Sequence, residues 1–343
     1  MTASAHILKD SNSVTRVMLL VLACLLPGIL TYAWHFGWGI VINLAWASIL
    51  ALALEAFALR LRGYPLKPFL SDGSAVVTAW LLALSLPPLA PWWLMLVGMV
   101  FAIGVAKHLY GGLGQNIFNP AMVGFAVLII SFPAQMTQWA APLALAAQPL
   151  SFGDSLAYIF GGGLPPGVAL DAVVSATPLD TVRTGLLQQH TLGEIHAASS
   201  IFGGIGGVGG EWVAAAYLAG GIALWAFRIV PWQVPVAFLA GIWLTAGFLH
   251  WADAGRYAAP WFQIATPSAM LGAFFIATDP VSGATTPRGR IIFGLGAGFL
   301  TVIIRVFGGY PDGVAFAILL MNLCVPLIDA YTQPPVFGAT RKK

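Results

Sequence analysis

Residues 39–59, GIVINLAWASILALALEAFAL, decide the fold of this protein. The stretch is 21 residues long and carries one charged side chain, Glu55. A helix needs roughly 20 apolar residues to cross a bilayer core about 30 Å thick. The stretch therefore predicts a membrane-spanning α-helix.

Nine further stretches of the same character flank it. Together they predict about ten spans, at 14–34, 39–59, 74–90, 91–110, 119–134, 211–230, 232–251, 260–278, 290–307 and 313–331. Several are short or interrupted, and the third and eighth run into Pro87-Pro88 and Asp279-Pro280. We expect an all-α integral membrane protein with broken helices.

The composition excludes the soluble classes. Of 343 residues, 59% are hydrophobic and 8% are charged, against roughly 25% charged in ordinary soluble domains. So few charges cannot form the polar surface of a soluble enzyme or a nucleic-acid binder, and a disordered chain would not be this apolar.

The basic residues predict the orientation. Ten spans place both termini on one side. If that side is the cytoplasm, twelve of the 15 Lys and Arg residues, Lys107 among them, lie inside, and Arg183, Arg256 and Arg305 lie outside. Cytoplasmic loops are enriched in Lys and Arg. We therefore expect cytoplasmic termini and an outward, periplasmic loop at 135–210.

The two halves resemble each other. SAVVTAWLLALSLPP (74–88) is echoed by SAMLGAFFIATDP (268–280), and YGGLGQNIFNPAMVGFAVLI (110–129) by FGGYPDGVAFAILLMNLCVPLI (307–328). Five spans separate the copies, so the second is inverted in the membrane. Such repeats place binding sites near the midplane. The predicted divisions are a five-helix repeat at 1–134, the periplasmic loop at 135–210, a second repeat at 211–331 and a basic tail at 332–343.

The sequence lacks the residues that several kinds of catalytic or metal site require. Cys24 and Cys324 both lie in apolar runs, which excludes a four-cysteine cluster or a disulfide framework. They are interpreted as packing residues, with a cluster shared with partner chains as the alternative. The sequence carries no nucleophilic triad, metal site or phosphate-binding loop. We predict no catalytic residue and no metal.

Two segments each carry a threonine six positions after an aspartate. They are DAVVSATPLD, from Asp171 to Asp180, and DPVSGATTPR, from Asp279 to Arg288. The threonines are Thr177 and Thr285. A hydroxyl in a turn of small residues is sterically open and can accept a phosphoryl group.

The chain resembles a known family over almost its whole length. Residues 71–88, GGLGQNIFNPAMVGF (111–125), SATPLDT (175–181) and FFIATDPVSGATTPRGR (274–290) resemble, in this order, the RnfD membrane subunits of Rnf electron-transport complexes. The NqrB subunits of the sodium-pumping NADH:quinone reductase are homologous. They usually carry an N-terminal extension, whereas the first span here begins near residue 14, which favours the RnfD type.

The resemblance implies an FMN joined by a phosphoester to a threonine, attached by a flavin transferase outside the cytoplasmic membrane. Thr285 matches the family motif better, but the predicted topology places it inside, so Thr177 is the predicted attachment site. Asp171 and Ser175 are expected to position its hydroxyl or the incoming phosphate.

The turn at Thr285 has two interpretations. It either satisfies backbone groups at the end of a broken helix or lines a noncovalent riboflavin pocket, with Asp279 and Asn116 as further candidates. Intramembrane acids are costly and usually functional, so Glu55 and Asp329 are candidates for an ion path. For Glu55 an internally paired structural carboxylate is the alternative.

The resemblance implies a flavin-carrying subunit that relays electrons between NADH and ferredoxin, coupled to Na⁺ or H⁺ movement. Its expected partners are iron–sulfur, NADH-binding and second FMN subunits in a bacterial inner membrane. Two alternatives stay open: the NqrB subunit of the quinone reductase, and a flavin-free channel or secondary transporter.

Overall fold

The computed structural model describes residues 3–333, with side chains from Val14 onward. The side chain of Lys9 and residues 334–343 of the predicted basic tail lie outside that part. The elements, in chain order, are α1 (Ala3–Phe36), α2 (Gly39–Leu61), α3 (Leu66–Leu70), α4 (Ser74–Ser85), α5 (Trp92–Met99), η1 (Val100–Leu109), α6 (Pro120–Ser131), α7 (Pro133–Met136), β1 (Trp139–Ala140), α8 (Phe152–Gly161), η2 (Leu170–Ala172), β2 (Val174–Ser175), α9 (Pro178–Leu187), α10 (Leu192–Ala198), α11 (Gly210–Ala226), α12 (Gln233–Ala252), α13 (Pro260–Ile264), α14 (Pro267–Leu271), η3 (Gly272–Ile276), α15 (Pro287–Phe307) and α16 (Val314–Thr332).

The helices confirm an all-α integral membrane protein. Within residues 3–333, seven helical segments are long and apolar enough to cross a membrane: Val14–Phe36, Gly39–Leu61, Leu66–Ser85, Trp92–Leu109, Gln233–Ala252, Pro287–Phe307 and Val314–Thr332. The shorter apolar segments Pro120–Ser131 and Pro267–Ile276, and α11 with its 17 residues, occupy the other predicted places.

Prolines end or divide two of the predicted spans. The third was predicted to stop at Pro87-Pro88, and its helix ends at Ser85, because proline after Leu86 disfavours helical backbone at the preceding residue and removes a donor. The eighth was predicted over 260–278, but it divides into α13 and the continuous pair α14–η3. Pro267 enforces that break and starts the second piece.

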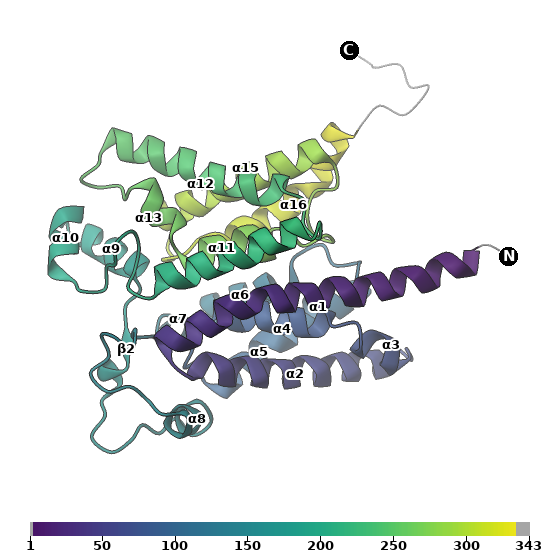
Figure 1. Ribbon diagram of the computed structural model, residues 1–343, viewed down its shortest axis with the longest axis horizontal. Coiled ribbons are helices and arrows are strands. Elements are labelled where there is room, and N and C mark those ends of the chain that lie inside the picture. The colour runs from purple at the N-terminus through teal and green to yellow at the C-terminus, as the bar shows by residue number, and fades with distance from the viewer. Residues whose placement is uncertain (1–2, 334–343) are drawn as a thin grey trace, which may run out of the picture.

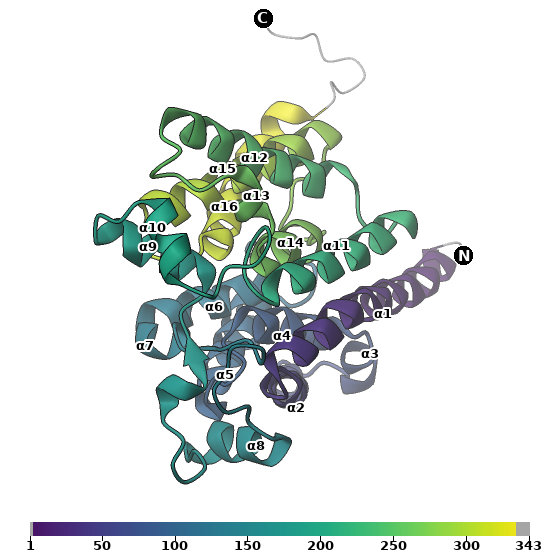
Figure 2. The same cartoon turned by 60° about the vertical axis from the view of Figure 1, so that its left-hand side comes forward.

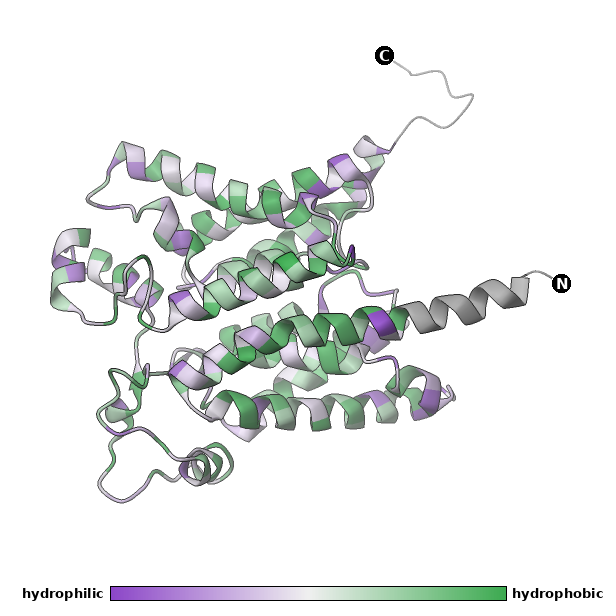
Figure 3. Ribbon diagram, viewed as in Figure 1, coloured by the Kyte–Doolittle hydropathy of each residue, from purple (hydrophilic) through white to green (hydrophobic). Residues whose placement is uncertain are grey.

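The spans form two groups. In Figure 1, α1–α6 lie in the lower part and α11–α16 in the upper part, with α1 and α11 side by side along the boundary; Figure 2 agrees. The helix α1 begins and α16 ends at one end of the bundle, and α7–α10 lie at the opposite end. We call these the termini end and the loop end. Figure 3 shows apolar residues along the spans and polar ones concentrated at the ends.

Glycine allows the helices to approach closely. A Cβ at Gly220 of α11 would meet the backbone oxygen of Cys24 in α1, and a Cβ at Gly298 of α15 would meet the oxygen of Phe238 in α12. Membrane helices associate through such small-residue contacts, because lipid supplies no hydrophobic force between them. The boundary between the two groups is therefore tightly packed near Gly220.

Four helices begin with the same short pattern. Asn119, Thr177, Thr266 and Thr286 each precede a proline, and each side chain accepts a hydrogen bond from a backbone N–H of the first turn. Asn and Thr are good N-caps, and proline fits the first helical position because that N–H has no partner anyway. Thr177, predicted to lie in an open turn, is thus the cap of α9.

Candidate functional site

Two cavities lie between the two helix groups, at opposite ends. The larger, about 310 Å³, is lined by residues that include Met18, Lys107, Asn119, Asp279 and Thr285. The smaller, about 180 Å³, is lined by residues that include Phe36, Trp139, Thr177, Ser268 and Asp312. We call them the termini-side cavity and the loop-side cavity.

A short antiparallel ladder and a glycine-rich loop hold Thr177 at the loop-side cavity. Trp139 pairs with Ser175, and the neighbouring pair fixes the start of the segment that ends at Thr177. On the other side, a Cβ at Gly207 would overlap Pro178. Ser175 and Thr177 both line the cavity. The close approach of the glycine loop therefore sets where the threonine hydroxyl lies.

Glu211 fixes that loop. The residue opens α11, and its Oε2 accepts hydrogen bonds from the backbone N–H groups of Ile205 (3.1 Å) and Gly206 (3.2 Å). A carboxylate that accepts two backbone donors is a strong constraint on a loop. The loop wall of the cavity is thereby tied to a spanning helix.

The Thr177 hydroxyl is half-buried and lies at the start of a ten-residue helix. Its Oγ1 accepts a hydrogen bond from the Asp180 N–H at 3.2 Å. The positive end of a helix dipole favours a negative group such as a phosphate at this point. Burial raises the pKa of Asp180, and Arg183 opposes that rise. Asp171 is exposed on η2 and does not line the cavity.

The opposite wall contains a buried arginine. Arg305, in the last turn of α15, is 5% exposed. Its Nε donates to Asp312 at 3.1 Å, and one terminal nitrogen donates to the backbone and side-chain oxygens of Gln263. The other donates to the hydroxyls of Thr266 and Ser268, both at 3.1 Å. The guanidinium is therefore fully engaged behind the hydroxyls that line the cavity.

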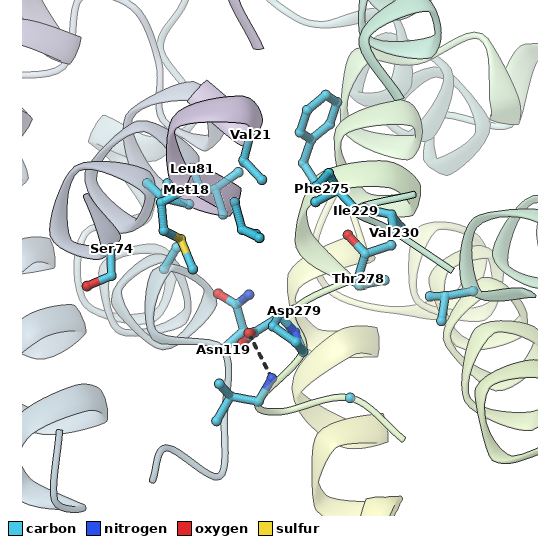
Figure 4. A pocket seen from close by; sticks show the side chains of 18 of the residues that line it. Met18, Val21, Ser74, Leu81, Asn119, Ile229, Val230, Phe275, Thr278 and Asp279 are labelled. Atoms are coloured by element: carbon cyan, nitrogen blue, oxygen red, sulfur yellow. Dashed lines mark hydrogen bonds between the residues drawn. The ribbon is translucent and has the colours of Figure 1, made fainter. Parts of the chain in front are cut away.

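The termini-side cavity has apolar walls and a polar floor. Figure 4 shows Met18, Leu81 and Asn119 from the first group facing Phe275 and Asp279 from the second. The buried Asn119 caps α6 and reaches across the boundary: its N–H donates to Asn322 Oδ1 at 3.1 Å. Asn322 in turn donates to the backbone oxygen of Ser282 at 2.9 Å.

The predicted pocket candidates Asn116 and Asp279 both line this cavity. Asn116 is buried and donates to the backbone oxygen of Phe118 at 3.0 Å. Asp279 accepts from the N–H of Val281 at 3.1 Å and from the Ser282 hydroxyl at 2.8 Å. The carboxylate thus shapes the turn and borders the cavity at the same time.

Thr285 and Asp329 are bound to each other. The Thr285 hydroxyl donates to Asp329 Oδ2 at 2.8 Å, and its N–H donates to Oδ1 at 3.0 Å. The next residue, Thr286, caps α15. The hydroxyl of Thr285 therefore has a structural partner, and the carboxylate of Asp329 holds the turn to α16.

Glu55 is paired inside the protein. Its carboxylate lies 2.9 Å from Lys107 Nζ and 3.1 Å from His108 Nε2, and the Glu55 and Lys107 side chains are each 2% exposed. Arg62 contacts the other ring nitrogen of His108 at 3.3 Å. Lys107 also donates to Ser74 at 3.0 Å, and both residues line the termini-side cavity.

Two buried cations were not predicted from the sequence. Lys107 and Arg305 were counted as loop charges, but both are buried in helices. Removing them leaves eleven basic residues predicted inside against two outside, so the predicted bias is unchanged. Lys107 contacts Glu55 of α2, 52 positions away, whereas Arg305 contacts Asp312 in the turn that follows its own helix. Of the two cysteines, Cys24 is buried and Cys324 is exposed.

Broken helices, two cavities between helix groups and buried ion pairs define a multi-pass membrane protein with internal cavities, the places where such proteins usually hold ligands. The chain belongs to the NQR2, RnfD, RnfE family, which it matches over residues 1–338. This confirms the resemblance found in the sequence.

Full-length relatives are named as the D subunits of ion-translocating oxidoreductase complexes. The chain is 50% identical to the one from Aeromonas hydrophila over 349 residues, covering 99% of each chain. It is 49% identical to the one from Vibrio cholerae, covering 98% of each. It is 48% identical to the one from Escherichia fergusonii, covering 98% of this chain and 97% of the relative.

Proposed function

We propose that this chain is the flavin-carrying membrane subunit, of the RnfD type, in an ion-translocating oxidoreductase complex, with FMN joined through its phosphate to Thr177. One observation carries the proposal: the Thr177 hydroxyl lines a cavity between the two helix groups and lies at the start of α9. A phosphoester at that oxygen lies where the helix dipole favours negative charge.

The residues of the loop-side cavity suit an aromatic ring. Tyr32, Phe36, Trp139 and Phe262 line it, and flat apolar walls with a few polar groups are typical of cofactor sites. Bound FMN supplies electron transfer. The chain's own part is to hold the phosphate end at Thr177, exclude water with the aromatic walls and set the polarity around the ring.

We propose that the termini-side cavity holds a second, noncovalent flavin, riboflavin. Its apolar walls, Asn116 and Asp279 support this assignment. Thr285 borders the same cavity, but its hydroxyl is engaged with Asp329, which favours Thr177 over Thr285 as the attachment site. Both ion-path candidates lie near this cavity, Glu55 through Lys107 and Asp329 through Thr285.

In this proposal both termini lie in the cytoplasm and the loop end faces the periplasm of a bacterial inner membrane. The chain relays electrons between NADH and ferredoxin through iron–sulfur, NADH-binding and second FMN subunits, coupled to Na⁺ or H⁺ movement. The loop-side location of Thr177 makes it accessible to a flavin transferase acting outside the membrane.

The test is flavin fluorescence in a denaturing gel, on wild type, Thr177→Ala and Thr285→Ala, each co-expressed with the flavin transferase. We expect fluorescence to be lost in Thr177→Ala and kept in Thr285→Ala. Loss in Thr285→Ala alone overturns the attachment site and the orientation. A wild-type chain without covalent flavin, beside an active transferase, favours a flavin-free transporter, and quinone reduction by the purified complex favours an NqrB-type subunit.

A further inference from the structure

Each helix group contains a serine that accepts a hydrogen bond from a buried cation. Ser74 begins α4, and its Oγ lies 3.0 Å from Lys107 Nζ. Ser268 lies in the first turn of α14, and its Oγ lies 3.1 Å from a terminal nitrogen of Arg305. The two serines occupy matching positions in the predicted repeat, SAVV and SAML. In both halves the cation comes from the next spanning helix.

Acidic and amide groups hold each cation in place. Glu55 pairs with Lys107, and Asp312 together with Gln263 binds Arg305. A buried charge is tolerated only when it is paired and hydrogen-bonded. The acids therefore fix the cations, whose remaining donors point at the serine oxygens.

Each serine lines a different cavity. Ser74 borders the termini-side cavity (Figure 4), and Ser268 borders the loop-side cavity. A hydroxyl carries one proton and two lone pairs. The cation uses one lone pair of each serine oxygen, so each hydroxyl keeps its second lone pair and its own proton, which it can donate.

Among the described residues, that proton has at most one long hydrogen bond available to it. Across the described side chains, the Ser74 hydroxyl donates to no acceptor. The nearest acceptor of Ser268 is Thr266 Oγ1 at 3.4 Å, which already accepts from Ala269 N–H and from Arg305. Each hydroxyl thus keeps a proton available to a ligand in the cavity that its residue lines, and the cation bound to each oxygen strengthens it as a donor.

We propose that Ser74 and Ser268 each donate a charge-assisted hydrogen bond to an electron-rich group of the flavin in their own cavity, and thereby raise that flavin's reduction potential. The inference rests on the proposed function. Hydrogen bonds and charge near the ring nitrogens tune flavin electronics, because reduction adds negative charge that a donor stabilises. Lys107 and Arg305 act through the serines as positioning residues.

The test is a spectroelectrochemical titration of the intact complex with Ser74→Ala or Ser268→Ala. Acid extraction first separates the noncovalent flavin from the covalent one and quantifies each. We expect Ser74→Ala to lower the midpoint potential of the noncovalent flavin and leave that of the covalent flavin unchanged. Ser268→Ala gives the reverse, so each variant is the control for the other. Ser74→Thr and Ser268→Thr keep the hydroxyl and restore the potential.

Two further hydroxyls provide matched controls. Ser85 lines the loop-side cavity but donates its proton to the backbone oxygen of Leu81 at 2.7 Å. Thr78 lines the termini-side cavity but donates to the backbone oxygen of Ser74 at 3.1 Å. Ser85→Ala and Thr78→Val therefore leave both potentials unchanged.

The outcomes separate the two proposals. Unchanged potentials in both Ser→Ala variants, at normal flavin content, overturn the inference and leave the proposed function standing. Equal shifts of both flavins in either variant also overturn it, since they report a general structural change. If a Ser→Ala variant loses one flavin and the matching Ser→Thr variant restores it, the contact is supported. If the Ser→Thr variant does not restore that flavin, the contact is contradicted. A wild-type complex without these flavins overturns the proposed function itself.

Discussion

The Glu55 carboxylate and the Lys107 ammonium lie 2.9 Å apart, each on a side chain 2% exposed. The acid is on α2 and the base on η1, so the pair joins two spanning segments of one helix group. Because the same ammonium binds Ser74 at the termini-side cavity, this ion pair connects the packing of the helices to the polarity of the cavity.

Removing one partner of this ion pair should lower the stability of the protein more than replacing both partners with apolar residues. Glu55→Leu leaves Lys107 buried without its carboxylate, which we expect to cost about 3–5 kcal/mol. Glu55→Leu/Lys107→Met replaces both charges with apolar groups and should recover most of that loss. Thermal unfolding in detergent measures both. A double variant no more stable than the single one would show that the pairing itself contributes little.

Gly207→Ala should reduce covalent flavin attachment. A Cβ at this position overlaps Pro178, next to Thr177, and such overpacking costs about 1–3 kcal/mol when the neighbours must shift. We expect a lower ratio of gel fluorescence to protein than in wild type. Gly204→Ala is the matched control, because nothing lies within 4 Å of a Cβ there. Equal losses in both variants would contradict this role for Gly207.

Asn322→Ala should weaken the contact between the two helix groups. The buried Asn322 accepts from the Asn119 N–H and donates to the Ser282 oxygen, so its removal leaves two buried polar groups unpaired, at about 1–3 kcal/mol each. The expected result is a lower unfolding temperature and loss of the noncovalent flavin. Leu323→Ala, on the exposed side of the same helix, should change neither.

The loop end should show pH effects of opposite sign in adjacent helices. Burial raises the pKa of Asp180, so the stability of α9 is greatest below the ordinary carboxyl pKa of about 4 and falls as pH rises through the higher folded-state pKa. Hydrogen bonds from Thr191 lower the pKa of Glu194, so α10 loses stability as pH falls through that lower value. Hydrogen exchange of the two helices measures this.

Asp180→Asn should abolish the pH dependence of α9, and Glu194→Gln that of α10. Both substitutions remove titration while keeping a polar side chain of similar size. Protection factors in α9, which are corrected for the intrinsic pH dependence of exchange, that keep their pH profile after Asp180→Asn would show that another group titrates there.

Much of the fold is readable from local patterns. Runs such as 39–59 are apolar throughout, and a chain must form helices wherever lipid cannot satisfy its backbone. The Asn119-Pro120 and Thr286-Pro287 pairs also mark where helices begin. The span at 260–278 was predicted as one piece, because its apolar run continues through Pro267, which divides α13 from α14.

The candidate site was only partly predictable. Thr177, Asn116 and Asp279 were named from their motifs, and each borders one of the two cavities. Lys107 and Arg305 were missed because a basic residue near the end of a span is, by itself, indistinguishable from a loop charge. The burial of Lys107 depends on Glu55, 52 positions away, and that of Arg305 on Gln263, 42 positions away, together with Asp312 in the turn after its own helix.

The sequence by itself determined that this is a helical membrane protein and which family it belongs to, and it predicted Thr177 as the attachment threonine, because hydropathy, motif order and charge bias are properties of the chain read in order. Tertiary structure decided where the cavities lie, which cations are buried and which serines they polarise. Those features depend on contacts such as Ser74–Lys107 and Ser268–Arg305, which packing makes between residues more than 30 positions apart.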